Sequence, residues 1–292
     1  MGGTAWLFSR PEAQGQFDYL FVDEAGQFSL ANAVGVGLST SNLVLVGDQM
    51  QLAQPVLGTH PGESGQSALN YLLDGYQTIP PHMGIFLGQT WRLHPAICGF
   101  ISDAVYEGRL KSHPRTAAQR IETNGDMISK QAGILFIPTV HDGNSQGSEE
   151  EVAIVEQVVN DLVGCQFWDS ETSTLRRIDR DDILIVAPFN MQVRMLKKRL
   201  GHDIQVGSVD KFQGQEAQVV IVSMCSSTLE DSPRGAEFLF EPNRLNVAIS
   251  RAKTLAIVVG SPEVVAARCK SIKEMELANL FCWLVDYSCG EA

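Results

Sequence analysis

The stretch FDYLFVDEAG at residues 17–26 combines an apolar run with two adjacent carboxylates at its end. Four further apolar or β-branched runs alternate with helical stretches: NLVLVGD at 42–48, DILIVAPFN at 182–190, AQVVIVSMC at 217–225 and TLAIVVGSP at 254–262. Parallel strands that are covered on both faces are apolar throughout and are joined by crossover helices. The sequence therefore predicts an α/β protein with a parallel sheet. Its functional residues are expected at the carboxyl ends of the strands.

The composition favours an ordinary globular protein. The 292 residues are 44% hydrophobic and 19% charged, and we predict two α/β units over residues 1–88 and 89–292. Residues 111–150 are polar, and GNSQGSEE at 143–150 is expected to form an exposed loop before an amphipathic helix near Glu150.

Charge, cysteine pattern and hydropathy narrow the class of protein. No apolar run approaches the roughly 18 residues that span a bilayer, so a cytoplasmic protein without a membrane partner is expected. The six cysteines contain no C-x-x-C pair, which indicates reduced thiols rather than a zinc site. A net charge of −12 argues against coating nucleic acid by overall charge and leaves only a local groove open.

Two polar stretches follow the first two predicted strands. Asp23 and Glu24 stand where a nucleotide hydrolase needs one carboxylate to organise Mg²⁺ and a second to orient water. A capped helix after a strand would place acidic residues in the same way. The second stretch, GDQMQL at 47–52, carries a glutamine that can reach a terminal phosphate, although a plain turn also fits. The ordered pair favours a hydrolase.

Three later stretches carry cations and a carboxylate. Arg92, in TWRLHP at 90–95, offers a fork of donors suited to phosphate, whereas a surface arginine beside a packed tryptophan is the alternative. We predict a structural role for His94. The loop SVDKFQGQE at 208–216 can grip a nucleic-acid phosphate while Glu216 accepts from a ribose hydroxyl.

The last of these stretches is NRLNVAISRAK at 243–253. The spacing of Arg244 and Arg251, about two helical turns, predicts that both lie on one face of a helix. Such a face is either a solvated stripe or, as we favour, a surface from which Arg251 meets a γ-phosphate.

DEAG, GDQMQL, TWRLHP, SVDKFQGQE and NRLNVAISRAK, in this order, resemble motifs II to VI of the superfamily 1B helicases, the group that includes the nonsense-mediated-decay helicase. The resemblance implies a RecA-like P-loop NTPase fold, with one complete C-terminal RecA-like domain and the later part of the first. GTAWLF at 3–8 and SSTLEDSPRGAEFLF at 226–240 look most like bacterial helicases fused to a RecB-like nuclease.

The same resemblance assigns roles to individual residues. Asp23 would hold Mg²⁺, Glu24 would act on the attacking water, and Gln51 would sense the γ-phosphate of ATP. Arg92 and Arg251 would be arginine fingers in the cleft between the domains. The remaining assignments place Glu216, Gly214 and Arg244 at the nucleotide and Ser208, Lys211 and Pro188 beside single-stranded nucleic acid. Arg194, Lys197, Lys198 and Arg199 form either a basic rim or, as we favour, a solvated helical face.

The pattern lacks two motifs of the family, the P-loop and the motif that couples the P-loop to the nucleic acid. No G-x-x-x-x-G-K-[ST] occurs, and the resemblance places this P-loop upstream of residue 1. We favour the C-terminal portion of an ATP-dependent 5′-to-3′ helicase, acting on DNA by its bacterial likeness, with an upstream P-loop region and perhaps a RecB-like nuclease domain as partners. A non-hydrolysing binding module and a half-motor complemented by a separate P-loop chain are the alternatives. Retention of Glu24, Gln51 and Arg251 counts against the binding module.

Overall fold

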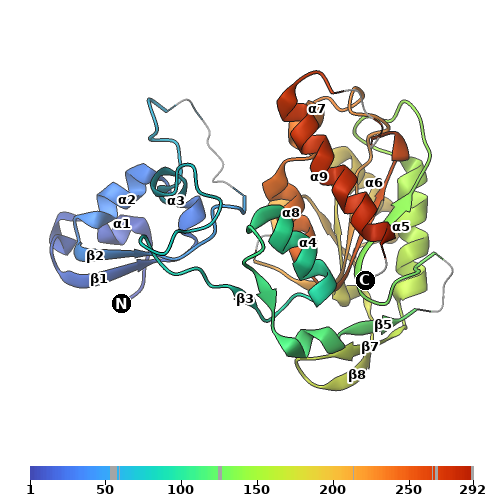
Figure 1. Ribbon diagram of the computed structural model, residues 1–292, viewed down its shortest axis with the longest axis horizontal. Coiled ribbons are helices and arrows are strands. Elements are labelled where there is room, and N and C mark those ends of the chain that lie inside the picture. Colours follow the sequence, from blue (N-terminus) through green and yellow to red (C-terminus); the bar gives the residue numbers. More distant parts are fainter. Residues whose placement is uncertain are drawn as a thin grey trace. The chain divides into compact units, whose positions relative to one another are not determined.

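The computed structural model describes residues 1–52, 58, 60–123, 127–212, 214–264, 266 and 269–290. The chain divides into two compact units, Met1–Phe86 and Leu87–Ala292 (Figure 1). Among the described residues, no helix is long and apolar enough to cross a membrane.

The first unit is built on two parallel strands, β1 (Phe17–Val22) and β2 (Thr40–Leu45). Its helices are α1 (Ala5–Phe8), α2 (Leu30–Gly37) and α3 (Ala68–Leu72), with 3-10 turns at Pro11–Ala13 and Ala25–Gln27. The core of this unit is apolar and includes Phe8, Leu20, Val22, Val36 and Leu69.

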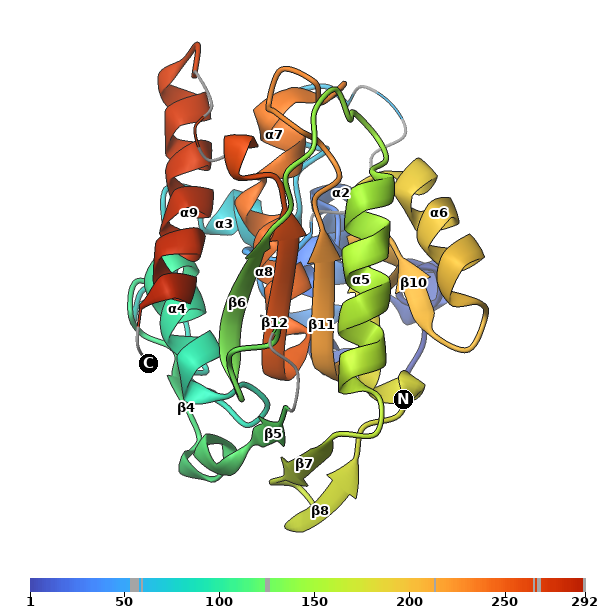
Figure 2. The same cartoon turned by 90° about the vertical axis from the view of Figure 1, so that its right-hand side faces the viewer.

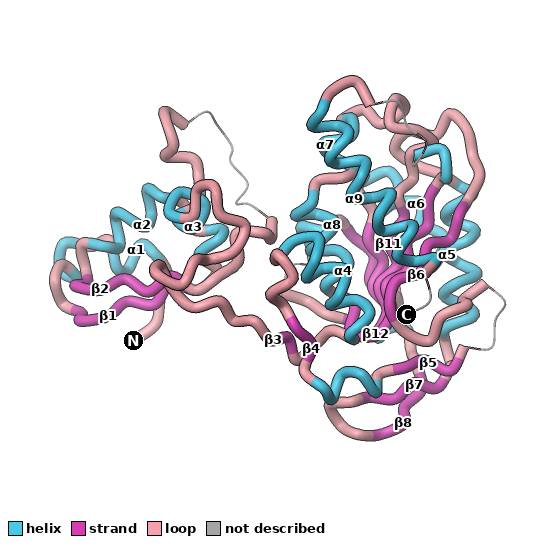
Figure 3. The backbone as a smooth tube through the Cα atoms, in the orientation of Figure 1, coloured by secondary structure: helices cyan, strands magenta, loops and turns pink. Residues whose placement is uncertain are grey.

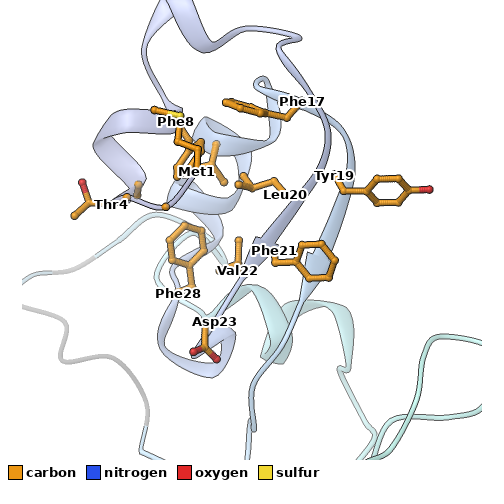
Figure 4. Close-up of a pocket in the computed structure, with 14 residues that line it drawn as sticks. Met1, Thr4, Phe8, Phe17, Tyr19, Leu20, Phe21, Val22, Asp23 and Phe28 are labelled. Carbon is orange, nitrogen blue, oxygen red and sulfur yellow. The ribbon is translucent and has the colours of Figure 1, made fainter.

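The two faces of β1 differ in exposure. Leu20 and Val22 are buried, whereas Tyr19 and Phe21 are 63% and 68% exposed. Figure 4 shows Phe8, Leu20, Val22 and Phe28 together on one side of β1, and the rings of Tyr19 and Phe21 on its other side. The prediction that both sheet faces are covered is therefore wrong for the described part of this unit.

The second unit contains a five-stranded sheet in the order β10-β9-β11-β12-β6, and every pair in it is parallel. The strands are β6 (Gly133–Pro138), β9 (Ile183–Val186), β10 (Gln205–Gly207), β11 (Ala217–Ser223) and β12 (Ala252–Gly260). All seven residues of β11 are buried, as expected for a central strand with helices on both sides. The predicted α/β class with a parallel sheet is confirmed.

Helices cover both faces of this sheet (Figures 2 and 3). One face packs against α5 (Glu149–Leu162) and α6 (Asn190–Leu200), and the other against α4 (Pro95–Val105), α8 (Pro242–Ser250) and α9 (Ile272–Cys289). The expected amphipathic helix near Glu150 is α5, which begins with Ser148 as its N-cap. The remaining helical elements are α7 (Gly235–Leu239) and 3-10 turns at Pro114–Ala118, Arg180–Asp182, Val209–Phe212 and Pro262–Val264.

Several strands of the second unit escape sequence reasoning. Residues 111–150, predicted to be polar, contain the edge strand β6, whose sequence GILFIP is largely buried. A three-stranded antiparallel sheet joins β5 (Arg120–Glu122), β7 (Gln166–Asp169) and β8 (Thr174–Arg177). A short parallel pair, β3 (Gln89–Thr90) and β4 (Lys111–Ser112), precedes them along the chain.

Candidate functional site

In the first unit, the candidate residues lie on the two loops that leave the carboxyl ends of β1 and β2. Ala25 N donates to Val46 O at 2.9 Å, which joins the loops directly after the strands. A Cβ on Gly26 would lie 2.3 Å from Asp48 O, and one on Gly47 would lie 2.6 Å from Ala25 N. The backbones of the two loops therefore touch, and only glycine fits at these two positions.

Asp23 and Glu24 are exposed at this carboxyl edge. Glu24 adopts the left-handed conformation (φ 53°, ψ 40°), and its N–H donates to Asp23 Oδ1 at 3.0 Å. A non-glycine residue in this region is strained, and such strain gathers at functional sites. Gln51 is held on the neighbouring loop, where its Nε2 donates to Asp48 Oδ2 at 3.1 Å.

In the second unit, the candidate residues divide between two opposite ends of the parallel sheet. Pro188 and Ser208 follow β9 and β10 at their carboxyl ends. Glu216 and Arg251 instead directly precede β11 and β12, at the amino end of the sheet. The prediction that functional residues lie at carboxyl strand ends is therefore wrong for Glu216 and Arg251. The reason is that Glu216 and Arg251 each stand directly before a strand, whereas Asp23 and Glu24 directly follow one.

A cluster of charged side chains lies at the amino end. Arg92 forms an ion pair with Glu216, although the two lie far apart in the sequence. Lys253 Nζ lies 2.7 Å from Glu216 Oε1 and 3.0 Å from Glu171 Oε1. Gln119, a buried residue, donates both to Arg92 O and to Ser170 Oγ, which ties the β7–β8 hairpin to the cluster. The fold thus joins TWRLHP, SVDKFQGQE and NRLNVAISRAK at one place.

The charges in this cluster shift one another's protonation. Burial by itself would raise the pKa of Glu216, but the hydrogen bond from Lys253 and the charge of Arg92 outweigh burial and hold this pKa below 4.5. Burial would lower the pKa of Lys253, but its contacts with Glu216 and Glu171 hold it above 10.5. Both groups are therefore charged at neutral pH.

These shifts give a pH-dependent contribution to stability. Because the pKa of Glu216 is lower in the folded chain than in the unfolded one, its contribution is present above pH 4.5 and is lost as the pH falls through the folded-state pKa. Glu216→Gln removes this contribution. We expect the difference in urea midpoint between the wild type and Glu216→Gln to shrink as the pH is lowered from about 6 to about 3.5. A difference that stays constant over this range would contradict the prediction.

The two arginines of NRLNVAISRAK have different surroundings. Helix α8 ends at Ser250, so Arg251 is its C-cap; the side chain is buried, and its Nη1 donates to Gln215 O at 3.3 Å. Arg244 pairs with Glu241 at 2.7 Å and Asp210 at 3.3 Å. Arg251 thus contacts the segment beside Glu216, while Arg244 is held by the carboxylate that directly precedes α8 and by one of the 208–216 loop. Gly214 of this loop is exposed with φ 76°, and Gln213 lies outside the described residues.

His94 has the structural role predicted for it. Its Nδ1 accepts from Ala96 N at 3.2 Å and so caps the amino end of α4. Burial lowers its pKa, which favours the neutral ring that this contact requires.

Aromatic and basic side chains accompany the candidate nucleic-acid residues. Lys211 is exposed, its backbone N–H donates to Ser208 O at 3.0 Å, and Pro188 is half-buried. The ring of Phe189 lies 5.2 Å from that of Phe238, over which Arg234 and Arg244 are both placed within 4.7 Å. Arg199, near the end of α6, pairs with Glu156 at 2.8 Å, as a solvated helical face predicts.

A fully buried polar network lies near the carboxyl end of the same sheet. Glu151 accepts from Ser223 Oγ at 2.6 Å, from Cys225 N at 2.9 Å, and contacts His141 Nε2 at 3.0 Å. Gln192, in the first turn of α6, donates to Ser223 Oγ at 2.8 Å. The network therefore fixes α5 and the start of α6, which follows the Pro188 loop, to the end of β11.

Sequence reasoning missed three residues that the structure brings into these sites: Lys253, Trp91 and Glu151. Trp91 is 51% exposed beside Arg92 and stacks on His113, with ring centroids 3.7 Å apart. Trp91 lies in TWRLHP and Lys253 in NRLNVAISRAK, so their place in these motifs could have identified them as candidates. Nothing in the sequence distinguishes Glu151 from its neighbours Glu149 and Glu150 except its place on the apolar face of α5.

Comparisons with known proteins give a family and several relatives that cover most of the chain. A family model described as an AAA domain matches residues 65–263. The chain is 27% identical over 83% of its length to the DNA-binding protein SMUBP-2 of Rattus norvegicus, and 29% identical over 86% to a regulator of nonsense transcripts 1 homolog of Drosophila melanogaster. It is 25% identical over 84% to the DNA replication ATP-dependent helicase/nuclease JHS1 of Arabidopsis thaliana.

The chain spans 25%, 21% and 19% of the lengths of these three relatives. Among solved structures, Arterivirus nonstructural protein 10 (helicase) in complex with DNA aligns with a TM-score of 0.42 and 15% identity, over 85% of this chain and 41% of that one.

The helix-covered parallel sheet and the polar motif loops at its ends define an α/β protein of the RecA-like class. The chain belongs to the AAA domain family, whose model matches residues 65–263, and the relatives that it resembles include a protein named as a helicase/nuclease.

Proposed function

We propose that this chain is the C-terminal part of the motor of an ATP-dependent helicase that moves 5′-to-3′ on nucleic acid, with DNA as the favoured substrate. One observation carries the proposal. The loop at 208–216 runs from the carboxyl end of β10 to the amino end of β11, so it joins Ser208 and Lys211 at one end of the sheet to Glu216 at the other. The seven residues of β11 separate these ends by about 20 Å. A single segment thus connects the proposed nucleic-acid grip to the proposed nucleotide contact.

At the amino end of the sheet, the charged groups suit a nucleoside triphosphate. The guanidinium groups of Arg92 and Arg251 stabilise charge that develops on the γ-phosphoryl group, and the Glu216 carboxylate accepts from a ribose hydroxyl. The side chain of Arg92 is 39% exposed. When the nucleotide binds, Arg92 leaves its ion pair with Glu216 and contacts the phosphate. Gly214 borders this nucleotide contact. The assignment of Arg244 to the nucleotide rests on the resemblance of the motifs, since its guanidinium group contacts Asp210 and the Phe238 ring.

In the first unit, Asp23 and Glu24 have separate roles: Asp23 would hold Mg²⁺ and Glu24 acts on the attacking water. An exposed carboxylate at a strand end suits Mg²⁺, which proteins bind through one or two carboxylates together with waters and phosphates. When bound, Mg²⁺ neutralises charge on the phosphate oxygens. Glu24 orients and deprotonates the attacking water, and Gln51 reports the loss of the γ-phosphate. A P-loop in an upstream region holds the β- and γ-phosphates.

At the carboxyl end of the sheet, Pro188, Ser208 and Lys211 contact the backbone of a single strand. Backbone amides, hydroxyls and lysines position nucleic acid without reading its sequence. The 5′-to-3′ polarity, the preference for DNA and an accompanying RecB-like nuclease rest on the resemblance of the motifs. The relative named as an Arabidopsis helicase/nuclease supports the last of these.

The experiment is ATP hydrolysis with and without single-stranded DNA, by the 292-residue chain and by a version extended upstream through a P-loop. We expect turnover only in the extended protein. Glu24→Gln in that protein should reduce turnover by about 10²–10⁴-fold, because it removes the carboxylate that acts on water. Gln16→Glu, a charge change on an exposed residue before β1, is the matched control and should leave turnover unchanged. Hydrolysis by the short chain alone would show that this account of the phosphate site is wrong.

A further inference from the structure

Lys253 is the least exposed member of the charged cluster at the amino end of the sheet. Its side chain is 12% exposed, against 34% for Glu216, 39% for Arg92 and 44% for Glu171. Its ammonium group contacts two carboxylates at 2.7 and 3.0 Å. A lysine enclosed in this way is a poor ligand for an incoming phosphate, because both carboxylates already take its charge.

The main chain of Lys253 is also fixed. Its carbonyl accepts from His94 N at 2.9 Å, which ties it to the start of α4 and to TWRLHP. On either side of it, Ala252 pairs with Ala217 and Leu255 with Val219 in the sheet. The register of the two strands shifts between these two pairs, and Lys253 lies at this shift. Its ammonium group therefore projects from an irregular part of β12 that paired residues flank on both sides, whereas Glu216 projects from the end of a loop.

The cluster has a charge balance that depends on this lysine. Two cations, Arg92 and Lys253, face two carboxylates, and Glu216 takes a contact from each cation on a different oxygen. If Arg92 leaves for a phosphate, Glu216 keeps Lys253 as its partner. Without Lys253, Glu216 would lose the contact that fixes one of its oxygens, and among the described residues Arg92 would be its remaining ion-pair partner.

We infer that Lys253 is a positioning residue, which holds Glu216 in place for the ribose and so releases Arg92 to act on the phosphates. This inference rests on the proposed function and adds a residue to which that function gives no role. Glu171, on the turn between β7 and β8, is the second partner of the lysine and makes no contact with the nucleotide in this scheme.

The test uses the full protein with its upstream P-loop region and compares ATP with 2′,3′-dideoxy-ATP, which lacks the ribose hydroxyls. The measured quantity is the ratio of kcat/KM for the two nucleotides. Wild type should prefer ATP by about tenfold, the size expected for one hydrogen bond to a charged group. Lys253→Met should raise KM for ATP about tenfold and abolish the preference, whereas Lys253→Arg should retain most of it.

Two further variants separate positioning from folding. Glu171→Gln removes the other partner of the same lysine and should keep the preference within about twofold of wild type. In a Glu216→Gln background, where no preference remains, adding Lys253→Met should change it less than about twofold, because both changes remove one interaction. Lys253→Gln tests the same point if the methionine variant unfolds, since it keeps a polar group at this position.

The outcomes distinguish this inference from the function beneath it. If Glu216→Gln loses the preference and Lys253→Met or Lys253→Gln keeps it, the inference is overturned and the proposed function stands. If Glu216→Gln keeps the preference, the ribose contact itself is wrong, and the role given to Lys253 is wrong with it. Absence of hydrolysis by the wild-type full protein would overturn both.

Discussion

Replacing Arg251 by lysine is expected to lower nucleic-acid-stimulated ATP hydrolysis by about 10³-fold or more in the protein that carries its P-loop. Arginine fingers owe this effect to a planar fork of donors that a lysine ammonium cannot reproduce. Arg251 is buried and donates to Gln215 O, so its direction is set by the segment that also carries Glu216. KM for ATP should change much less than kcat, because the role proposed for the arginine is to stabilise charge that develops in the transition state.

The matched control for this prediction is Arg199→Lys. Arg199 lies on the solvated face of α6 and pairs with Glu156 of α5. Its replacement should leave kcat within about twofold of wild type. Thermal unfolding of both variants shows whether the buried position tolerates lysine. A folded Arg251→Lys protein with kcat within tenfold of wild type would remove Arg251 from the catalytic set.

Replacing Glu151 by alanine is expected to lower the free energy of unfolding by about 3–5 kcal/mol. The carboxylate is fully buried and accepts from Ser223 Oγ and Cys225 N, while His141 contacts it at 3.0 Å. Its removal leaves several buried donors without a partner, and each one costs more than the original bond contributed. Urea unfolding followed by far-UV circular dichroism measures the loss.

Glu149→Ala is the control for Glu151→Ala. Both residues lie in the first turn of α5 and interact with the same helix dipole, but Glu149 is exposed. We expect it to change stability by less than about 1 kcal/mol. Equal effects of the two substitutions would mean that the buried network adds nothing beyond the helix terminus.

The sequence predicted the central strands well because they are apolar on both faces. β9, β11 and β12 lie in the sheet where the runs ILIV, AQVVIVS and TLAIVVG were found. It failed at β6, whose apolar residues follow a stretch of polar loops, and at the antiparallel β5-β7-β8 sheet. β8 has the sequence TLRR, and all four of its residues are exposed, so no periodicity marks it as a strand.

Motif order predicts which residues belong to the candidate site and does not show where they meet. Asp23, Glu24 and Gln51 lie on touching loops, as expected for residues that follow neighbouring parallel strands. The ion pair of Arg92 with Glu216 depends on how α4 and the 208–216 loop pack, which no local pattern encodes. The role of Lys253 has the same origin.

The contact between Gly26 and Gly47 has a mechanical consequence. Where side chains separate two loops, the loops can move relative to each other because the side chains can change rotamer. Here the backbones meet directly, with Asp48 O against Gly26 and Ala25 N against Gly47. A displacement of the loop that carries Gln51 therefore moves the loop that carries Asp23 and Glu24 by nearly the same amount, so that the two loops move as one rigid unit.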